Sequence, residues 1–434
     1  MHAAPLILGL AGCPDDEAGT TFPAADLVLH PGASFVSGER SPADGTAVVE
    51  GATDDDHDWS LAIRGGALVV GVPAVGEVRR YTIDDFSAGG GVVVATGDIE
   101  ARYGAAVDAG EGRVIVGAPD HDVGPDGPGT GLVERLGGGA AQVAGVVTQG
   151  RFGSLVAACG DIDGDGVPEW AATAPWEGDI AGAVYVGGYT EAAVDTSALR
   201  RVAGSTPGAL FGNAVLCTSA LLGGNATLAV GAPFGTGAGD VEAEGNVTLW
   251  SNDDILDGAP SWTVYGRAAG EVDTPEYFGS TLAACELDGD GLPELVVGAP
   301  GASAGLGAAY VYRGSNIQSS GLGFAYAHVI RGASTDARLG ASIACGDVDG
   351  DGLDELFVGA PGENQADGTR QSGALFAFHG PLSSWNEQLF AGADEWAVLR
   401  EDRAFLETGK RFAVGDLDGD GLADLVVLVR QRAR

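Results

Sequence analysis

The sequence is poor in basic side chains and in histidine. It contains 22 Lys and Arg residues against 61 Asp and Glu residues, which gives a formal net charge of −39. Nucleic-acid-binding proteins neutralise phosphates with an excess of Lys and Arg, so this balance argues against a nucleic-acid partner. The six histidines are scattered without the spacing of metal ligands, which argues against a zinc or iron site.

The sequence also has no apolar segment long enough to cross a bilayer. Its N-terminal apolar run, residues 5–11, is short and is followed by Gly12 and Cys13. The tetrapeptide Leu10-Ala11-Gly12-Cys13 resembles the bacterial lipobox, in which the Cys is lipidated and becomes the first residue of the mature protein.

This resemblance implies a lipoprotein signal peptide over residues 1–12, a lipid anchor on Cys13 and a tether over residues 13–25. It places the protein outside the cytoplasm, in the bacterial cell envelope: the outer membrane, the periplasm or the cell surface. The alternative is an ordinary apolar segment that contains a cysteine by chance.

Glycine is abundant, with 74 residues, but it follows no Gly-X-Y period, so the chain is not collagen-like. Hydrophobic residues make up 45% of the chain, which excludes an acidic disordered polymer. Instead, the glycines mark a unit that recurs seven times after residue 46. Each unit starts with an aromatic residue and Gly or a variant, as in Phe278-Gly279, and its second strand ends in Gly-Ala-Pro, as in residues 298–300.

Each complete unit is predicted to contain four short strands, because a third alternating strand and a fourth strand ending in Gly follow the Gly-Ala-Pro stop. Such units cannot bury both faces alone, so they stack, and radial stacking gives a β-propeller. The starts, the stops and the acidic loops described below resemble the FG-GAP repeat family, best known from the propeller of integrin α subunits. The resemblance implies an all-β, seven-bladed β-propeller of four-stranded antiparallel blades over residues 26–434.

The seventh unit has its first two strands but no third or fourth strand. Residues 26–30 and 46–51 are two strand-like segments that belong to no unit. We therefore predict that they form the third and fourth strands of blade seven, so that residues 26–51 complete this blade and close the ring.

Four units carry an acidic nine-residue loop between their first and second strands, with Asp or Glu at positions one, three, five and nine. Ca²⁺ prefers several oxygen ligands in flexible geometry, and the flanking strands distinguish these loops from EF-hands. In the FG-GAP family the same loop holds Ca²⁺, so the resemblance implies up to four Ca²⁺ ions. The alternative is a solvated acidic hairpin.

The candidate ligands are Asp161, Asp163, Asp165 and Glu169 in the first acidic loop, Glu286, Asp288, Asp290 and Glu294 in the second, Asp347, Asp349, Asp351 and Glu355 in the third, and Asp416, Asp418, Asp420 and Asp424 in the fourth.

The remaining cysteines, Cys159, Cys217, Cys285 and Cys345, each lie late in the first strand of a unit. In an exported protein, neighbouring units could be joined by disulfides between Cys159 and Cys217 and between Cys285 and Cys345. The alternative is that each cysteine packs as a small apolar side chain, because inner strands of neighbouring blades could lie too far apart for a bridge.

No pattern in the sequence predicts catalysis. Residues 301–305 fit Gly-x-Ser-x-Gly, but they follow a Gly-Ala-Pro stop and do not connect a strand to a helix. We therefore predict a non-enzymatic, calcium-binding and membrane-anchored module for binding or adhesion, with a protein or glycan ligand at the loop face opposite the acidic loops. The alternative is a carbohydrate-active propeller, either a lectin or a calcium-assisted polysaccharide lyase, although scarce Lys and His argue against a lyase.

Overall fold

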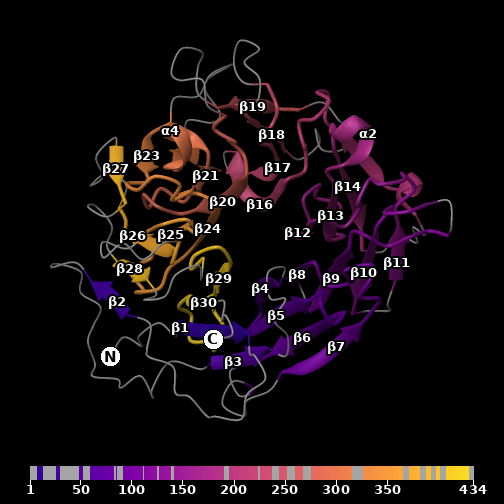
Figure 1. Ribbon diagram of the computed structural model, residues 1–434, viewed down its shortest axis with the longest axis horizontal. Coiled ribbons are helices and arrows are strands. Elements are labelled where there is room, and N and C mark those ends of the chain that lie inside the picture. The colour runs from indigo at the N-terminus through magenta and orange to yellow at the C-terminus, as the bar shows by residue number, and fades with distance from the viewer. Residues whose placement is uncertain are drawn as a thin grey trace.

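The computed structural model places seven β-sheets in a ring around a central axis (Figure 1). It describes residues 7–12, 26–29, 48–51, 59–82, 85, 91–110, 112–124, 127–137, 141–189, 195–222, 225–236, 244–251, 260–266, 275–314, 326–364, 371–381, 388–391, 397–400 and 407–429. The first strand of each unit lies at the axis and contacts the first strands of both neighbouring units. In this described part of the chain, no helix has the length and apolarity needed to span a bilayer.

Six of the sheets contain a complete blade of four antiparallel strands, and within a blade the strands follow chain order from the axis outward. Their bounds are β4 (Ser60–Arg64), β5 (Ala67–Val72), β6 (Glu77–Tyr81) and β7 (Val92–Thr96) in blade one; β8 (Ala106–Gly110), β9 (Arg113–Ala118), β10 (Leu132–Leu136) and β11 (Ala141–Ala144) in blade two; β12 (Val156–Gly160), β13 (Glu169–Ala174), β14 (Ala183–Gly188) and β15 (Arg200–Ala203) in blade three; β16 (Ala214–Leu222), β17 (Asn225–Ala232), β18 (Asn246–Ser251) and β19 (Trp262–Tyr265) in blade four; β20 (Thr281–Cys285), β21 (Glu294–Ala299), β22 (Ala308–Tyr312) and β23 (His328–Arg331) in blade five; and β24 (Ser342–Gly346), β25 (Glu355–Ala360), β26 (Ala374–Phe378) and β28 (Ala397–Arg400) in blade six.

The second strand is buried along its whole length in blades one, three, five and six, which explains its apolar run. Neighbouring blades share apolar clusters; one cluster joins Ala229 and Val247 of blade four to Leu295 and Val297 of blade five. The described loops contain the short helical turns α2 (Glu177–Ile180), η3 (Thr196–Ala198) and α4 (Ala302–Gly305).

The repeated glycines allow neighbouring blades to approach closely. A Cβ atom on Gly117, in the Gly-Ala-Pro segment of blade two, would stand 2.0 Å from the carbonyl oxygen of Gly153, in the Phe-Gly start of blade three. The same approach, at 2.1 Å, joins Gly298 of blade five to Gly340 of blade six. A side chain at Gly117 or Gly298 would force the two blades apart. The Gly-Ala-Pro stop of one blade therefore needs glycine because the start of the next blade packs against it.

The seventh sheet differs from the predicted blade. Its strands β29 (Phe412–Gly415) and β30 (Asp424–Val429) pair antiparallel, but β1 (Ile7–Gly12) and β3 (Val48–Gly51) then join in parallel. The structure therefore shows six complete antiparallel four-stranded blades, and the prediction of seven was wrong for the last sheet.

The assignment of the N-terminal strands was also only partly correct. Residues 48–51 lie in the last sheet, as predicted, but β2 (Asp26–Leu29) pairs with β28 at the outer edge of blade six. The third position of the last sheet belongs to β1, which forms five residue pairs with β30. An open strand edge accepts an extended apolar segment that reaches it, so an incomplete unit does not by itself determine which segment pairs there. A further strand, β27 (Gln388–Phe390), pairs in parallel with β23.

Candidate functional site

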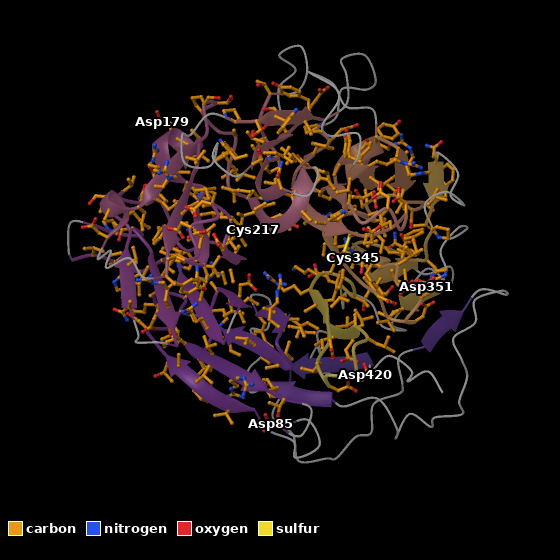
Figure 2. All side chains as sticks on the ribbon, turned by 180° about the vertical axis from the view of Figure 1, so that it is seen from behind. Asp85, Asp179, Cys217, Cys345, Asp351 and Asp420 are labelled. Atoms are coloured by element: carbon orange, nitrogen blue, oxygen red, sulfur yellow. A yellow bond between two sulfur atoms is a disulfide. The ribbon has the colours of Figure 1, made fainter. Side chains whose placement is uncertain are left out.

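The four acidic loops lie on one face of the ring. They connect β12 to β13, β20 to β21, β24 to β25 and β29 to β30, and each is the hairpin between the first and second strands of its sheet. Asp351 and Asp420, from the third and fourth loops, are labelled in Figure 2. The equivalent connections in blades one, two and four are short hairpins, at residues 64–67, 110–113 and 222–225.

The four loops share one pattern of hydrogen bonds, in which carboxylate oxygens accept from the loop's own backbone. The carboxylate at position nine accepts from the N–H of position two, as Glu294 does from Leu287 at 2.9 Å. The same bond is made by Glu169 with Ile162, Glu355 with Val348, and Asp424 with Leu417, at 3.0, 2.9 and 2.8 Å. In every loop the carboxylate at position one also accepts from the N–H of position four, the carboxylate at position three from the N–H of position five, and the carboxylate at position five from the N–H of position seven. These bonds turn the acidic side chains inward.

The inward side chains form clusters in which one oxygen of each member lies within 4.8 Å of the others. The clusters are Asp161, Asp163 and Glu169; Glu286, Asp288 and Asp290; Asp347, Asp349 and Asp351; and Asp416, Asp418 and Asp424. Of the other predicted ligands, Glu355 clusters with Asp349 and His379, whereas Asp165, Glu294 and Asp420 belong to none of these groups.

The carboxyl groups at position nine are buried. Burial, together with the charges of neighbouring loop carboxylates, raises the pKa of Glu169 to about 7 and that of Glu294 to about 8. Glu294 is fully buried, and its Oε1 atom has no hydrogen-bond partner among the described residues. A buried carboxylate oxygen without a partner, next to three further carboxylates, fits a divalent cation that prefers oxygen ligands.

Three of the loops are also hydrogen-bonded to one another. The Asp354 carboxylate of the third loop accepts from the Glu286 N–H of the second loop at 2.8 Å, and the Asp354 N–H donates back to the Glu286 carbonyl at 2.8 Å. The Ala423 N–H of the fourth loop donates to the Asp347 carbonyl of the third at 2.7 Å. The second, third and fourth loops therefore form a connected series across three neighbouring sheets.

Two residues beside these loops were missed by the sequence analysis. His379 donates or accepts a 2.6 Å hydrogen bond with Glu355, and Arg313 Nη1 lies 3.9 Å from Asp288. Burial opposes the charged form of the imidazole, but the contact with Glu355 raises the pKa of His379 above its ordinary value. Both residues directly follow the third strand of their blade, opposite position nine, so the strand register was the signal that could have identified them.

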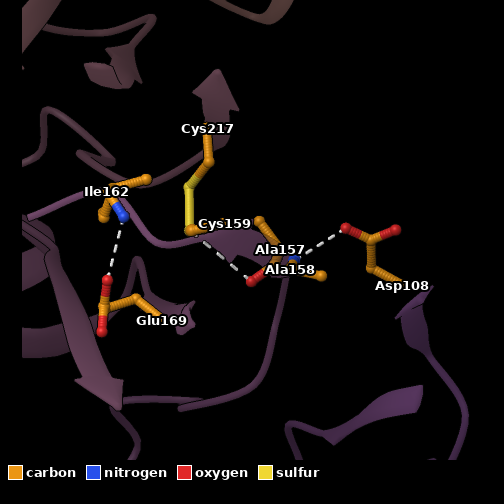
Figure 3. Close-up of a disulfide and its surroundings, with 7 residues drawn as sticks. All are labelled: Asp108, Ala157, Ala158, Cys159, Ile162, Glu169 and Cys217. Carbon is orange, nitrogen blue, oxygen red and sulfur yellow. Dashed lines mark hydrogen bonds between the residues drawn. A yellow bond between two sulfur atoms is a disulfide. The ribbon is translucent and has the colours of Figure 1, made fainter. Parts of the chain in front are cut away.

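Both of the disulfides that the sequence analysis considered are present in the structure. Cys159 is joined to Cys217 with a Cα–Cα distance of 4.9 Å, and Cys285 to Cys345 with a distance of 5.8 Å. Figure 3 shows the first bridge beside the bond between Ile162 and Glu169 of the first acidic loop. Asp108 of blade two also accepts from the Ala158 N–H at 2.8 Å, so the inner strands of blades two, three and four are connected there.

The opposite face is formed by the connections between strands two and three and between strands four and one. In the six units where the residue before the start is described, that residue has a positive φ: Arg102, Arg151, Leu210, Tyr277, Arg338 and Glu407. Arg151 lies 4.8 Å from the ring centroid of Trp176, which is 46% exposed, and 3.3 Å from Asp120. Phe234, also exposed, packs against Tyr277 with ring centroids 5.0 Å apart. These are two separate contact groups on the same face, and we call their five residues, Asp120, Arg151, Trp176, Phe234 and Tyr277, together the aromatic patch.

The Gly-x-Ser-x-Gly segment forms the α4 turn, in which the Ser303 hydroxyl accepts a hydrogen bond from Arg331 at 3.2 Å.

Comparison with known proteins identifies FG-GAP repeats in this chain, at residues 152–186, 278–312 and 339–377. These segments contain the first, second and third acidic loops. The chain is similar to integrin alpha-5 of Xenopus laevis, with 32% identity over 199 residues, which is 42% of this chain and 17% of that protein. It is similar to integrin alpha-V of Gallus gallus, with 30% identity over 164 residues, which is 37% of this chain and 14% of that protein.

The chain is also similar to phosphatidylinositol-glycan-specific phospholipase D of Rattus norvegicus, with 35% identity over 130 residues, which is 29% of this chain and 15% of that protein. The matched part therefore spans less than one fifth of the length of each of these three relatives.

Proposed function

We propose that this chain is a calcium-dependent interaction module built on an integrin-like FG-GAP propeller. The observation that carries the proposal is the hydrogen-bond pattern common to the four acidic loops, which turns carboxylates together and buries the one at position nine. Converging carboxylates repel one another unless a cation or protons neutralise them. Ca²⁺ accepts several oxygen ligands in flexible geometry, so each loop is expected to hold one ion, up to four in all.

Calcium binding is tested by stoichiometry and by thermal unfolding. Mass analysis of dialysed protein is expected to find up to four Ca²⁺ per chain, and EDTA is expected to lower the melting temperature. A free ion concentration 100 times the Kd stabilises the fold by about 2.7 kcal/mol per site. An equal melting temperature in Ca²⁺ and in EDTA would refute calcium binding.

The ligand is proposed to bind the face opposite the acidic loops, at the aromatic patch. Trp, Tyr and Arg side chains contribute most of the binding energy in many protein interfaces, and this patch displays all three types. A protein or glycan partner is expected, and the excess of acidic residues argues against nucleic acid. A pull-down with the full chain in Ca²⁺, repeated in EDTA, would identify the partner and its calcium dependence.

Membrane anchoring through Cys13, which lies outside the described residues, is part of the proposal. Cleavage before Cys13 would also remove β1 from the last sheet, because β1 comprises Ile7–Gly12. Mass spectrometry of the protein from bacterial membranes would test this: a diacylated Cys13 at the N-terminus supports the anchor, whereas an intact residue 1–12 segment refutes it. A lipid anchor would place the propeller in the cell envelope, outside the cytoplasm.

The proposal contains no catalytic step, although one similar protein is by name a phospholipase. A glycan array and a polysaccharide lyase assay distinguish it from the carbohydrate-active alternative. Specific sugar binding would make the module a lectin, and unsaturated sugar products would make it a lyase.

A further inference from the structure

His379 lies against the third acidic loop and contacts three of its carboxylates. Its Nδ1 atom is 2.6 Å from Glu355 Oε1 and 3.7 Å from Asp349 Oδ2, and its Nε2 atom is 3.8 Å from Asp351 Oδ2. One ligand atom each from Asp349, Glu355 and His379 lies within 4.8 Å of the others. The imidazole is therefore a member of the cluster and not merely a neighbour of it.

The strand register explains this position and makes the third loop different from the first two. Glu169 pairs with Gly188 across β13 and β14, so the first loop has no side chain at the equivalent place. In the second loop this place belongs to Arg313, a cation that cannot coordinate a metal ion. His379 is the equivalent residue of the third loop, one position beyond the Leu356–Phe378 pair.

A nitrogen ligand changes which ion the loop prefers. Ca²⁺ is bound through oxygen atoms, whereas imidazole with carboxylates suits first-row transition metals such as Zn²⁺. We propose that Asp349, Glu355 and His379 form a site for a first-row transition-metal ion, with Zn²⁺ as the representative. The inference rests on the proposed function only in using the third acidic loop, which holds Ca²⁺ when no transition metal is present and takes Zn²⁺ in its place when both ions are present.

The distances and burial support such a site. Zinc binds His nitrogen and carboxylate oxygen at roughly 2.0–2.2 Å, so two ligand atoms on one ion lie roughly 3–3.5 Å apart. The 3.7 Å between Nδ1 and Asp349 is close to this value, while the 2.6 Å to Glu355 has to widen by roughly 0.4–0.9 Å. Glu355 is held by its bond from Val348 and is fully buried, whereas the His379 ring is 32% exposed and is the partner that can move.

This site could not be identified from the spacing of residues in the sequence. His379 is 24 residues from Glu355, so no local spacing links them, and the scattered positions of the histidines argued against a zinc site. Antiparallel pairing of β25 with β26 brings them together.

The test is a Zn²⁺ titration of the full chain in excess Ca²⁺, with wild-type protein and the variants H379Q, R313H and H121Q. Wild type is expected to bind one Zn²⁺ that Ca²⁺ does not displace, and H379Q to bind it at least about tenfold more weakly. R313H is expected to gain a second Zn²⁺ site at the second loop. H121Q is the matched control, because His121 is another described histidine with no acidic loop beside it, and it should behave as wild type.

Nitrogen NMR of the histidine rings gives a second readout, which a purely structural role would not change. Zn²⁺ is expected to shift a ring nitrogen of His379 directly. Zn²⁺ binding that is equal in H379Q and wild type, or no Zn²⁺ bound by wild type, would overturn the inference. If the wild-type chain bound no Ca²⁺ at the other acidic loops, the proposed function would be overturned instead. The failure of the zinc site and the failure of the proposed function are therefore distinguishable.

Discussion

Replacement of Glu294 by Gln is expected to have opposite effects with and without Ca²⁺. In the metal-free protein the buried Glu294 carboxyl has a pKa of about 8, against an ordinary value of 4.5. A folded-state pKa above the unfolded one stabilises the fold at low pH, and this stability is lost as pH rises from about 4.5 to about 8. At pH 7 the linkage relation gives an upper limit of about 3 kcal/mol for the cost of this residue in the folded state.

Gln removes that cost because it carries no charge, and its amide oxygen can still accept from the Leu287 N–H. We therefore expect metal-free E294Q to be more stable than wild type by about 1–3 kcal/mol at pH 7, with a difference that vanishes near pH 4.5. In Ca²⁺ the order should reverse, because a neutral ligand weakens the site and each tenfold loss of affinity removes about 1.4 kcal/mol of stabilisation.

The assay is urea unfolding at several pH values, in EDTA and in Ca²⁺, with E100Q as the matched control because Glu100 is exposed. A destabilised E294Q in both EDTA and Ca²⁺ would refute the reasoning, since it would mean that the carboxylate has a structural role independent of any cation.

Three further predictions follow from other contacts. Replacing Cys285 and Cys345 together by Ser removes a disulfide between residues 60 positions apart. Loop-closure entropy then predicts that the free energy of unfolding falls by about 4 kcal/mol. Urea unfolding measures this, and an unchanged midpoint would count against the disulfide. R151A and W176A should each weaken partner capture at least tenfold without lowering the melting temperature, whereas V92A, at an exposed position on β7, should capture the partner normally. Calcium affinity of the first loop should fall as pH drops below about 7, because Glu169 then holds a proton that Ca²⁺ must displace; calorimetry that detects no proton release at pH 6.5 would contradict this.

Much of this fold could be predicted from the sequence, because the repeat motif corresponds to local backbone requirements. Gly117 and Gly153 show why: each glycine occupies a position where the neighbouring blade leaves no space for a side chain. The acidic loops could be predicted for the same reason, since alternating Asp and Gly residues set both the turns and the direction of the side chains.

The remaining features depend on pairings between distant segments. The edge of β30 pairs with β1 and not with residues 26–29, and the composition of these apolar segments does not determine that choice. The contacts of His379 and Asp354 could not be predicted for the same reason. His379 meets Glu355 only when two strands of one blade are in register, and Asp354 meets Glu286 only when two blades are packed together.

The contacts between loops predict that the proposed calcium sites in this ring are not equivalent. Asp354 joins the third loop to the second and Ala423 joins the fourth to the third, whereas the first loop has short hairpins in both neighbouring blades. An ion that orders the third loop therefore also orders hydrogen-bond partners of its two neighbours, which is a coupling between sites. We expect positive cooperativity among the second, third and fourth loops and independent binding at the first. In a calcium titration, D161N should remove one independent site, while D347N should weaken binding at the neighbouring loops as well; equal effects of the two variants would show that the loops act separately.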